Sequence, residues 1–439
     1  MKKRYYGKQT ELALRNFPFS KNPAPIEFIF AIAEVKKAAA LAHLKAGELN
    51  KDITDAIVTV CDEIERGLYN DQFITPGLQG GAGTSINMNV NEIIASRATE
   101  LLSQKKKQII VHPNDHVNRS QSTNDVNPSA AKIAIIRLTK ELLRCVDVAS
   151  DSLHKKGVEY KGVSKLARTH LQDAVPITMG DEFFSYESTI RRDRKRIEQA
   201  LSYFYELNLG GTAVGNMINA SLKYRQNVYK ELSKIIGFKV IPAENLMSAT
   251  SSQTDFCHLS QSVVCLLVDL SKIANDIRLL ASGPNGGLGE LQLLELQPGS
   301  SIMPGKVNPI LPESINQLYF LASGHNLTVE HAAEASQLEL GVMLPIIIDR
   351  LVLSLKLASE IIENFAINCV DQICVNEKQC RLHLERSTAY STLLSPVLGY
   401  ETMSAIVKES LKTGKTIREL VVGKKLLTTK EFDTHISNL

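Results

Sequence analysis

Apolar positions along the middle of the chain recur with a helical period. Between Phe256 and Leu280 they alternate spacings of three and four, at Phe256, Leu259, Val263, Leu266, Leu270, Ile273, Ile277 and Leu280. This heptad pattern is typical of helices that pack side by side. A second segment, from about Pro345 to Cys369, is apolar on more than one face, which is typical of a helix buried on several sides. We therefore predict long bundle helices through this part of the chain.

Strand signals are few and short. The best are "QIIVH" at 108–112 and "FKVI" at 238–241, and neither continues into a convincing alternating pattern. The sequence therefore predicts an all-α protein.

Composition narrows the class of protein. The 439 residues are 44% hydrophobic and 22% charged, as expected for a soluble globular chain. A net charge of only +3 argues against a nucleic-acid partner, and no apolar run is long enough to cross a membrane. The opening "MKKRYYGKQTELALRNF" lacks the apolar stretch that a secretory signal contains. The seven cysteines are scattered, and no two of them form a CxxC pair. We therefore expect a cytoplasmic protein with reduced thiols.

Four segments rich in Gly, Ser, Thr, Asn and Pro separate the helical patterns. They are "GLQGGAGTSINMNVNE", "HPNDHVNRSQSTNDVNPS", "ARTHLQDAVPITMG" and "ASGPNGGLGELQLLELQPGSSIMPGKVNP". We interpret them as loops, the usual place for chemistry on a rigid scaffold. They are far apart in sequence, so a single site would need the bundle to bring them together, across subunits if necessary.

The stretch "GSSIMPGKVNP" (299–309) looks suited to binding an anion. Asn308 before Pro309 predicts a helix start, and such a helix end attracts negative charge. Lys306 adds a full positive charge, so the loop is suited to a carboxylate. A phosphate loop fits poorly, because five residues separate Gly299 from Gly305 and Val307 follows the lysine. An inert polar surface loop remains the alternative.

Taken together, these segments resemble the fumarase/aspartase superfamily of lyases. "GSSIMPGKVNP" is similar to the superfamily's signature loop, and the resemblance extends from "YYGKQT" to "GKTIRELVVGKKLLT". "GAGTSINMNVNE", "QSTND", "ELQPGSSIMP" and "QLELGVM" look most like the aspartate ammonia-lyase branch.

The resemblance implies elimination of ammonia from L-aspartate to give fumarate, with no cofactor and no metal. It implies that Ser300 is the base, that Lys306 and Asn308 bind one carboxylate, and that Thr169 and His170 line the pocket. The other carboxylate becomes a doubly charged aci-carboxylate, which would be hydrogen-bonded by Thr84, Ser122, Thr123 and Asn124.

The resemblance also implies the architecture. We expect an all-α, three-domain lyase with an N-terminal helical domain (1–122), a central helix bundle with the catalytic loop (123–378) and a small C-terminal helical domain (379–439). The central bundle would form the multi-subunit helical core of a homotetramer, with sites shared between subunits.

Some features stay open. Where the superfamily usually has "GTAxGTGxN", this chain has "GTAVGNMIN", with Asn216 and Met217 in place of Thr and Gly.

His112 and His116 lack a third metal ligand, which favours a structural or solvated role for both. A fumarate hydratase and a catalytically silent homologue remain alternatives to an aspartase.

Overall fold

The computed structural model describes residues 3–19 and 22–436, and within them helices make up most of the regular structure. The helices are α1 (Lys8–Asn16), α2 (Ile26–Ala46), α3 (Lys51–Glu65), α4 (Thr84–Gln104), α5 (Thr123–Glu159), α6 (Met179–Ser202), α7 (Leu222–Ile236), α8 (Leu246–Ser251), α9 (Thr254–Leu280), α10 (Ile310–Glu334), α11 (Leu344–Asn368), α12 (Glu377–Arg386), α13 (Tyr390–Leu398), α14 (Tyr400–Thr413), α15 (Ile417–Gly423) and α16 (Thr429–Ile436). The strands are β1 (Ser164–Thr169), β2 (Gln172–Thr178), β3 (Glu206–Leu207), β4 (Ile241–Pro242), β5 (Leu291–Gln292) and β6 (Cys374–Val375). The predicted mostly helical class is confirmed.

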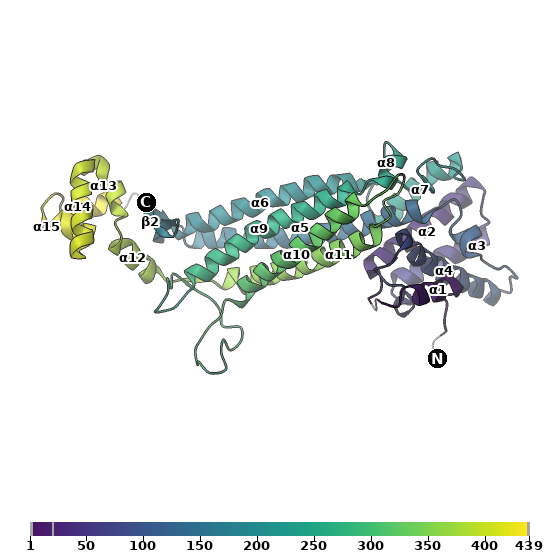
Figure 1. Cartoon of the computed structure of the whole chain (residues 1–439), viewed down its shortest axis with the longest axis horizontal. Helices are drawn as coiled ribbons and strands as arrows, with labels where there is room; N and C mark the ends of the chain where they lie inside the picture. Colours follow the sequence, from purple (N-terminus) through teal and green to yellow (C-terminus); the bar gives the residue numbers. More distant parts are fainter. Residues whose placement is uncertain (1–2, 20–21, 437–439) are drawn as a thin grey trace. The chain divides into compact units, whose positions relative to one another are not determined.

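The chain forms two compact units, each built from three separate segments. The first unit comprises Met1–Leu143, Lys195–Cys265 and Phe320–Ala358, and the second comprises Arg144–Arg194, Leu266–Tyr319 and Ser359–Leu439. The long helices α5, α6, α9, α10 and α11 contribute a segment to each unit (Figure 1). The three-domain division expected from the resemblance remains a prediction.

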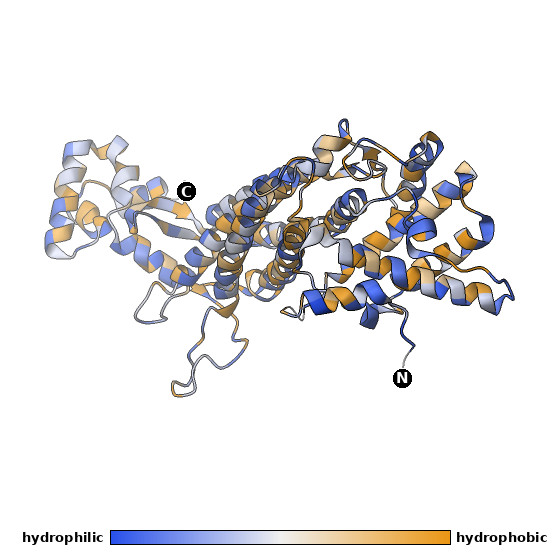
Figure 2. Cartoon of the chain, turned by 45° about the vertical axis from the view of Figure 1, so that its right-hand side comes forward, coloured by the Kyte–Doolittle hydropathy of each residue, from blue (hydrophilic) through white to orange (hydrophobic). Residues whose placement is uncertain are grey.

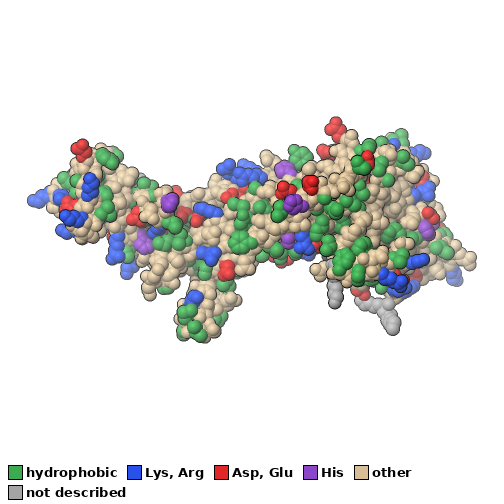
Figure 3. All heavy atoms as spheres, viewed as in Figure 1, with side chains coloured by type: hydrophobic (Ala, Val, Ile, Leu, Met, Phe, Trp, Pro, Cys, Tyr) green, Lys and Arg blue, Asp and Glu red, His purple; other side chains and the backbone are tan. Residues whose placement is uncertain are grey.

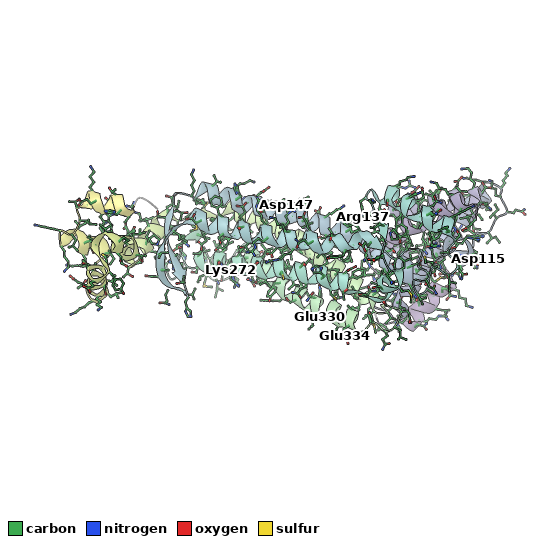
Figure 4. All side chains as sticks on the ribbon, turned by 90° about the horizontal axis from the view of Figure 1, so that it is seen from above. Asp115, Arg137, Asp147, Lys272, Glu330 and Glu334 are labelled. Atoms are coloured by element: carbon green, nitrogen blue, oxygen red, sulfur yellow. The ribbon has the colours of Figure 1, made fainter. Side chains whose placement is uncertain are left out.

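The heptad seam is buried, as predicted. All eight of its residues lie on α9, and none is more than 6% exposed. The predicted second apolar helix is α11, whose Ile347, Leu351 and Leu355 are at most 1% exposed. Hydrophilic and hydrophobic residues alternate around the long helices (Figure 2), and outward positions carry charges such as Lys272, Glu330 and Glu334 (Figure 4).

In the first unit, the N-terminal helices α1–α4 gather with α7 (Figure 1). Helix α2 is apolar on most of its circumference, and it packs against both α3 and α7. The carboxylate of Glu92 on α4 accepts hydrogen bonds from the backbone N–H groups of Gly7, Gln9 and Thr10, which satisfies the start of α1. This packing buries most of α2.

In the second unit, helices α12–α16 form a small core of their own. Leu384, Tyr390, Leu394, Met403 and Phe432 are at most 5% exposed and belong to this core. A capping box between Thr416 and Glu419 begins α15.

The short strand signals and one predicted loop differ from the structure. "QIIVH" forms no strand, and of "FKVI" only Ile241 belongs to one, the two-residue β4. The predicted loop "ARTHLQDAVPITMG" instead contains most of an antiparallel hairpin, β1–β2. Val175 is exposed while Lys165 and Thr178 are buried, so the hairpin lacks the apolar alternation that identifies a half-buried strand.

In the described parts of the chain, no helix is both long and apolar enough to cross a membrane.

Candidate active site

A polar pocket of about 700 Å³ opens in the first unit. It is lined by Thr84, Asn87, Met88, Asn118, Ser120, Gln121, Ser122, Thr123, Asn124, Thr212, Ala213, Val214, Asn216, Ile218 and Asn219. The structure thus brings together four predicted site residues, namely Thr84, Ser122, Thr123 and Asn124. None of these lining residues carries a charged side chain, and most offer a hydroxyl or an amide.

Two helices begin at this pocket. Thr84 is the first residue of α4 and Thr123 is the first residue of α5, and both line the cavity. The first-turn N–H groups of a helix lack intrahelical partners and carry partial positive charge. Two such ends at one cavity favour an anionic ligand.

The pocket wall, formed by 84–88, 118–124 and 208–219, has a strained backbone at several positions. Three lining residues, Ser120, Thr212 and Asn219, have φ between +55° and +66°, in the left-handed region that non-glycine residues rarely adopt. Strain of this kind persists where surrounding contacts enforce it, and it clusters at functional sites.

Hydrogen bonds from α5 hold this wall in place. The Asn124 side-chain amide donates to the Ala213 carbonyl at 2.8 Å, and the Asn208 amide donates to the Asn124 carbonyl at 2.9 Å. The Asp125 carboxylate accepts from the N–H groups of Gly210 and Thr212 at 2.9 and 3.0 Å. Asp125 is fully buried, and this burial raises the pKa of its carboxyl to about 6.

The unusual pair Asn216–Met217 belongs to the same wall. Asn216 lines the pocket, and Met217 has φ +64°, a conformation that costs a side chain more than the glycine usual in the superfamily. The departure therefore alters the pocket wall itself.

The second unit holds the other five predicted residues. Thr169 ends β1, and His170 and Leu171 form the two-residue turn to β2. Both turn residues have positive φ, +56° and +61°, as a hairpin turn of this length requires. Asn-Gly is the usual choice for such a turn, because these residues tolerate positive φ. His170 is exposed, and its positive φ is unfavourable for a residue with a side chain.

Ser300, Lys306 and Asn308 lie on the long connection between α9 and α10. The Ser300 hydroxyl oxygen accepts hydrogen bonds from the N–H groups of Ile302 and Met303, both at 3.2 Å. The Asn308 amide donates to the Gly299 carbonyl at 2.7 Å and closes the segment 299–308 on itself. Hydrophobic side chains gather at the end of this projecting loop (Figure 3), where Ile302 is 82% exposed.

The predicted helix start after this loop is one residue too early. We expected Pro309 to be the first helical residue after an Asn308 cap, but α10 begins at Ile310. The Asn308 side chain is already bonded to Gly299, which explains why it does not cap the helix.

Glu290 fixes the base of the loop and was not predicted as important. Its carboxylate is fully buried and accepts from Arg168 at 2.6 Å and from His383 at 2.7 Å. Burial alone would raise the pKa of Glu290, but these hydrogen bonds and the charge of Lys165 hold it below its ordinary value. Because Arg168 precedes Thr169 on β1, Glu290 joins the loop base to the hairpin.

Within the described residues of the second unit, no hydrogen bond or ion pair joins Ser300 or Lys306 to Thr169 or His170. The chain thus presents three groups of predicted residues: the pocket wall, the hairpin turn and the loop tip. The residues missed by sequence reasoning, Lys36, Asp125 and Glu290, are charged groups buried behind these segments. Asp125 ends the motif "QSTND" and Glu290 lies within the long segment 281–309, whereas Lys36 lies in no segment that the sequence analysis singled out.

Known proteins resemble this chain over almost its whole length. The family described as "Lyase" matches residues 2–324, and that described as "Fumarase C C-terminus" matches 391–438. Aspartate ammonia-lyase of Bacillus subtilis (strain 168) is 44% identical over 98% of this chain and 90% of its own. The Escherichia coli (strain K12) aspartate ammonia-lyase is 39% identical over 98% and 91%.

Solved structures also resemble this chain over almost its whole length. A fumarate lyase:delta crystallin from Brucella melitensis bound to cobalt has a TM-score of 0.94 and 43% identity, covering 98% of this chain and 94% of that one. A class II fumarase from Schistosoma mansoni has a TM-score of 0.93 and 34% identity, covering 99% and 95%. The predicted resemblance is confirmed: this chain belongs to the fumarase/aspartase superfamily and is a carbon–nitrogen lyase.

Proposed function

We propose that the protein is an aspartate ammonia-lyase that converts L-aspartate reversibly into fumarate and ammonia. The observation that carries this proposal is the pocket of hydroxyls, amides and two helix N-termini, which suits a dianionic carboxylate. The curated relatives support aspartate as the substrate, because five of them from different bacteria are named aspartate ammonia-lyase.

In the proposed mechanism, Ser300 is the base. As an alkoxide it removes a proton from the carbon next to one carboxylate of aspartate, and that carboxylate becomes a doubly charged aci-carboxylate. The bond between Cα and nitrogen then breaks, the carbon–carbon double bond of fumarate forms, and ammonia leaves. The two N–H groups that point at the Ser300 oxygen support this role, since hydrogen bonds to a charged form stabilise it.

The remaining residues would bind the substrate. Lys306 and Asn308 would hold the other carboxylate, while Thr84, Ser122, Thr123 and Asn124 would donate to the aci-carboxylate. Thr169 and His170 would line the pocket from the hairpin turn. The reaction needs neither a cofactor nor a metal under this proposal.

We further propose a cytoplasmic homotetramer in which each site is shared between subunits. The three groups of predicted residues lie on separate segments, which fits a site completed by neighbouring chains. Exposed apolar side chains on the long helices, such as Val268, Phe320 and Leu327, support subunit packing there.

The test is to supply the purified protein with L-aspartate or with L-malate and to follow fumarate by its ultraviolet absorbance. We expect fumarate from L-aspartate. Fumarate from L-malate alone would make the protein a fumarate hydratase, a reaction suggested by its likeness to the Schistosoma fumarase. Fumarate from neither substrate would indicate a catalytically silent homologue.

A further inference from the structure

A completely buried lysine lies directly behind the pocket. Lys36 on α2 is 0% exposed, and its ammonium donates to the side-chain oxygens of Asn118 at 2.7 Å and Gln121 at 3.0 Å. Both amides line the pocket. Among the described residues, no carboxylate lies within ion-pair distance of this ammonium, so its direct partners are neutral.

Asn118 connects Lys36 to the rest of the wall. Its side-chain oxygen also accepts from the amides of Asn87 and Asn91 on α4, each at 3.2 Å, and its own amide donates to the Gln121 carbonyl at 3.1 Å. An oxygen that accepts from three donors is fixed in position and strongly polarised. Lys36 thereby links α2, α4 and the turn that leads into Ser122–Asn124.

The buried charge is costly, which argues that it serves more than packing. Transfer of an ammonium into a protein interior is unfavourable unless it is well paired, and burial lowers the pKa of Lys36 to about 7. The charged or titratable groups that act on it are Asp125 of α5 and Cys61 of α3. An apolar side chain would fill the same volume without this cost.

The pocket that the charge adjoins has no charged lining residue of its own. The carboxylate that faces this lining would therefore meet only neutral donors, apart from the ammonium of Lys36 one hydrogen bond behind them. We propose that Lys36 is a positioning residue that orients Asn118 and Gln121 and places a positive charge behind the pocket for a dicarboxylate ligand. This inference rests on the substrate class of the proposed function and deepens it.

The experiment compares Lys36→Met with Lys37→Met, using the whole protein. Lys37 is the next residue of α2 but pairs with Asp62 and Glu65 instead. Calorimetry measures the Kd of succinate, a dicarboxylate that cannot lose ammonia, and thermal unfolding measures Tm. We expect Lys36→Met to raise the Kd of succinate roughly ten- to a hundredfold, with Tm unchanged or higher, and Lys37→Met to leave the Kd unchanged.

Two further measurements separate charge from structure. Succinamate, in which an amide replaces one carboxylate, should lose less affinity in Lys36→Met than succinate does. Lys36→Gln, which removes the positive charge but keeps a hydrogen-bond donor beside Asn118 and Gln121, should also weaken succinate binding, and it tests the inference even if Lys36→Met fails to fold.

The inference would be overturned if both Lys36 variants bound succinate with wild-type affinity. It would also be overturned if Lys36→Met lost as much affinity for succinamate as for succinate. A wild-type protein that binds no succinate would overturn it too. If the protein bound succinate but formed no fumarate from L-aspartate, only the proposed function would be contradicted. Failure of the proposed function can therefore be told apart from failure of the inference about Lys36.

Discussion

The pocket wall of the first unit and the loop 293–308 of the second unit are built in opposite ways. The wall is held from behind by buried polar groups, with Asp125 accepting three backbone N–H groups and Lys36 holding two amides. The loop tip is bonded chiefly to itself, through Ser300 and Asn308, and residues 301–307 are exposed.

This difference indicates a division of labour. Donors that stabilise a developing charge are effective when they are fixed before the reaction, and the wall meets that condition. A segment with few buried contacts opens at little cost, and loops that admit and enclose substrates are drawn from such segments. We therefore expect changes in the wall to affect both stability and activity, and changes in the loop to affect activity alone.

The largest effect should follow Ser300→Ala. Removal of the proposed base should lower kcat by roughly 10³-fold or more. Tm should stay unchanged, because among the described residues the Ser300 hydroxyl bonds only to N–H groups of its own loop. Fumarate formation from L-aspartate and thermal unfolding measure the two quantities. Ser301→Ala, at the adjacent exposed position, is the matched control and should retain most activity. Normal turnover by Ser300→Ala would show that the base is assigned wrongly.

Asp125→Asn should have the next largest effect, on stability. One oxygen becomes an amide that faces N–H donors, so buried hydrogen bonds are lost and unfolding should become easier by about 2–3 kcal/mol. Urea unfolding measures the change. Asp115→Asn, on an exposed turn where the side chain is 76% accessible, should change stability by less than about 0.5 kcal/mol. Equal stability of the two variants would mean that Asp125 does not hold the wall.

Gly299→Ala should reduce activity without reducing stability. A Cβ at this position would overlap the carbonyl oxygen of Lys306, so the closed segment 299–308 must rearrange. We expect kcat/KM to fall by about tenfold, in line with the sensitivity of catalysis to small misplacements, and Tm to stay the same. Gly83→Ala is its counterpart at the wall, where φ is +80° and a Cβ would lie 2.7 Å from the Asn127 amide. Gly83→Ala should lower both activity and Tm. A drop in Tm for Gly299→Ala too would contradict the proposed division between the wall and the loop.

The smallest effect concerns Glu100, which lies in the first unit but outside the pocket lining. Hydrogen bonds from Lys3, Arg97 and Tyr5 lower its pKa to about 2. Its folded-state pKa lies below the unfolded value of about 4.3, so its stabilisation is present above that pH and is lost as pH falls towards 2. Glu100→Gln should cost at most about 1 kcal/mol at pH 7, since solvent screens exposed pairs.

Urea unfolding between pH 7 and pH 3 checks this expectation. The difference between Glu100→Gln and wild type should shrink below about pH 4.5, and fumarate formation at pH 7 should be unchanged. A difference that grows on acidification would contradict the assignment.

The sequence predicted the helices well because their apolar spacing is set by packing. The α9 seam was predicted from its spacing and α11 from apolar residues on more than one face, and four residues of the motif "QSTND" line the pocket. The hairpin at 164–178 was missed because its strands mix polar and apolar residues without alternation and one of them contains Pro176. Lys36 was missed for a different reason: it lies within an apolar helix, and nothing in its neighbours indicates that Asn118 lies opposite.

The most direct test of the account asks whether the wall and the loop act on one substrate from different subunits. Chains carrying Ser300→Ala and chains carrying Asn124→Ala are co-expressed with different tags, and hybrids that contain both are purified. Each parent alone should be nearly inactive, whereas the hybrid should form fumarate from L-aspartate at a clearly higher rate, because some sites then combine an intact wall with an intact loop. A hybrid no more active than its parents would contradict the shared site.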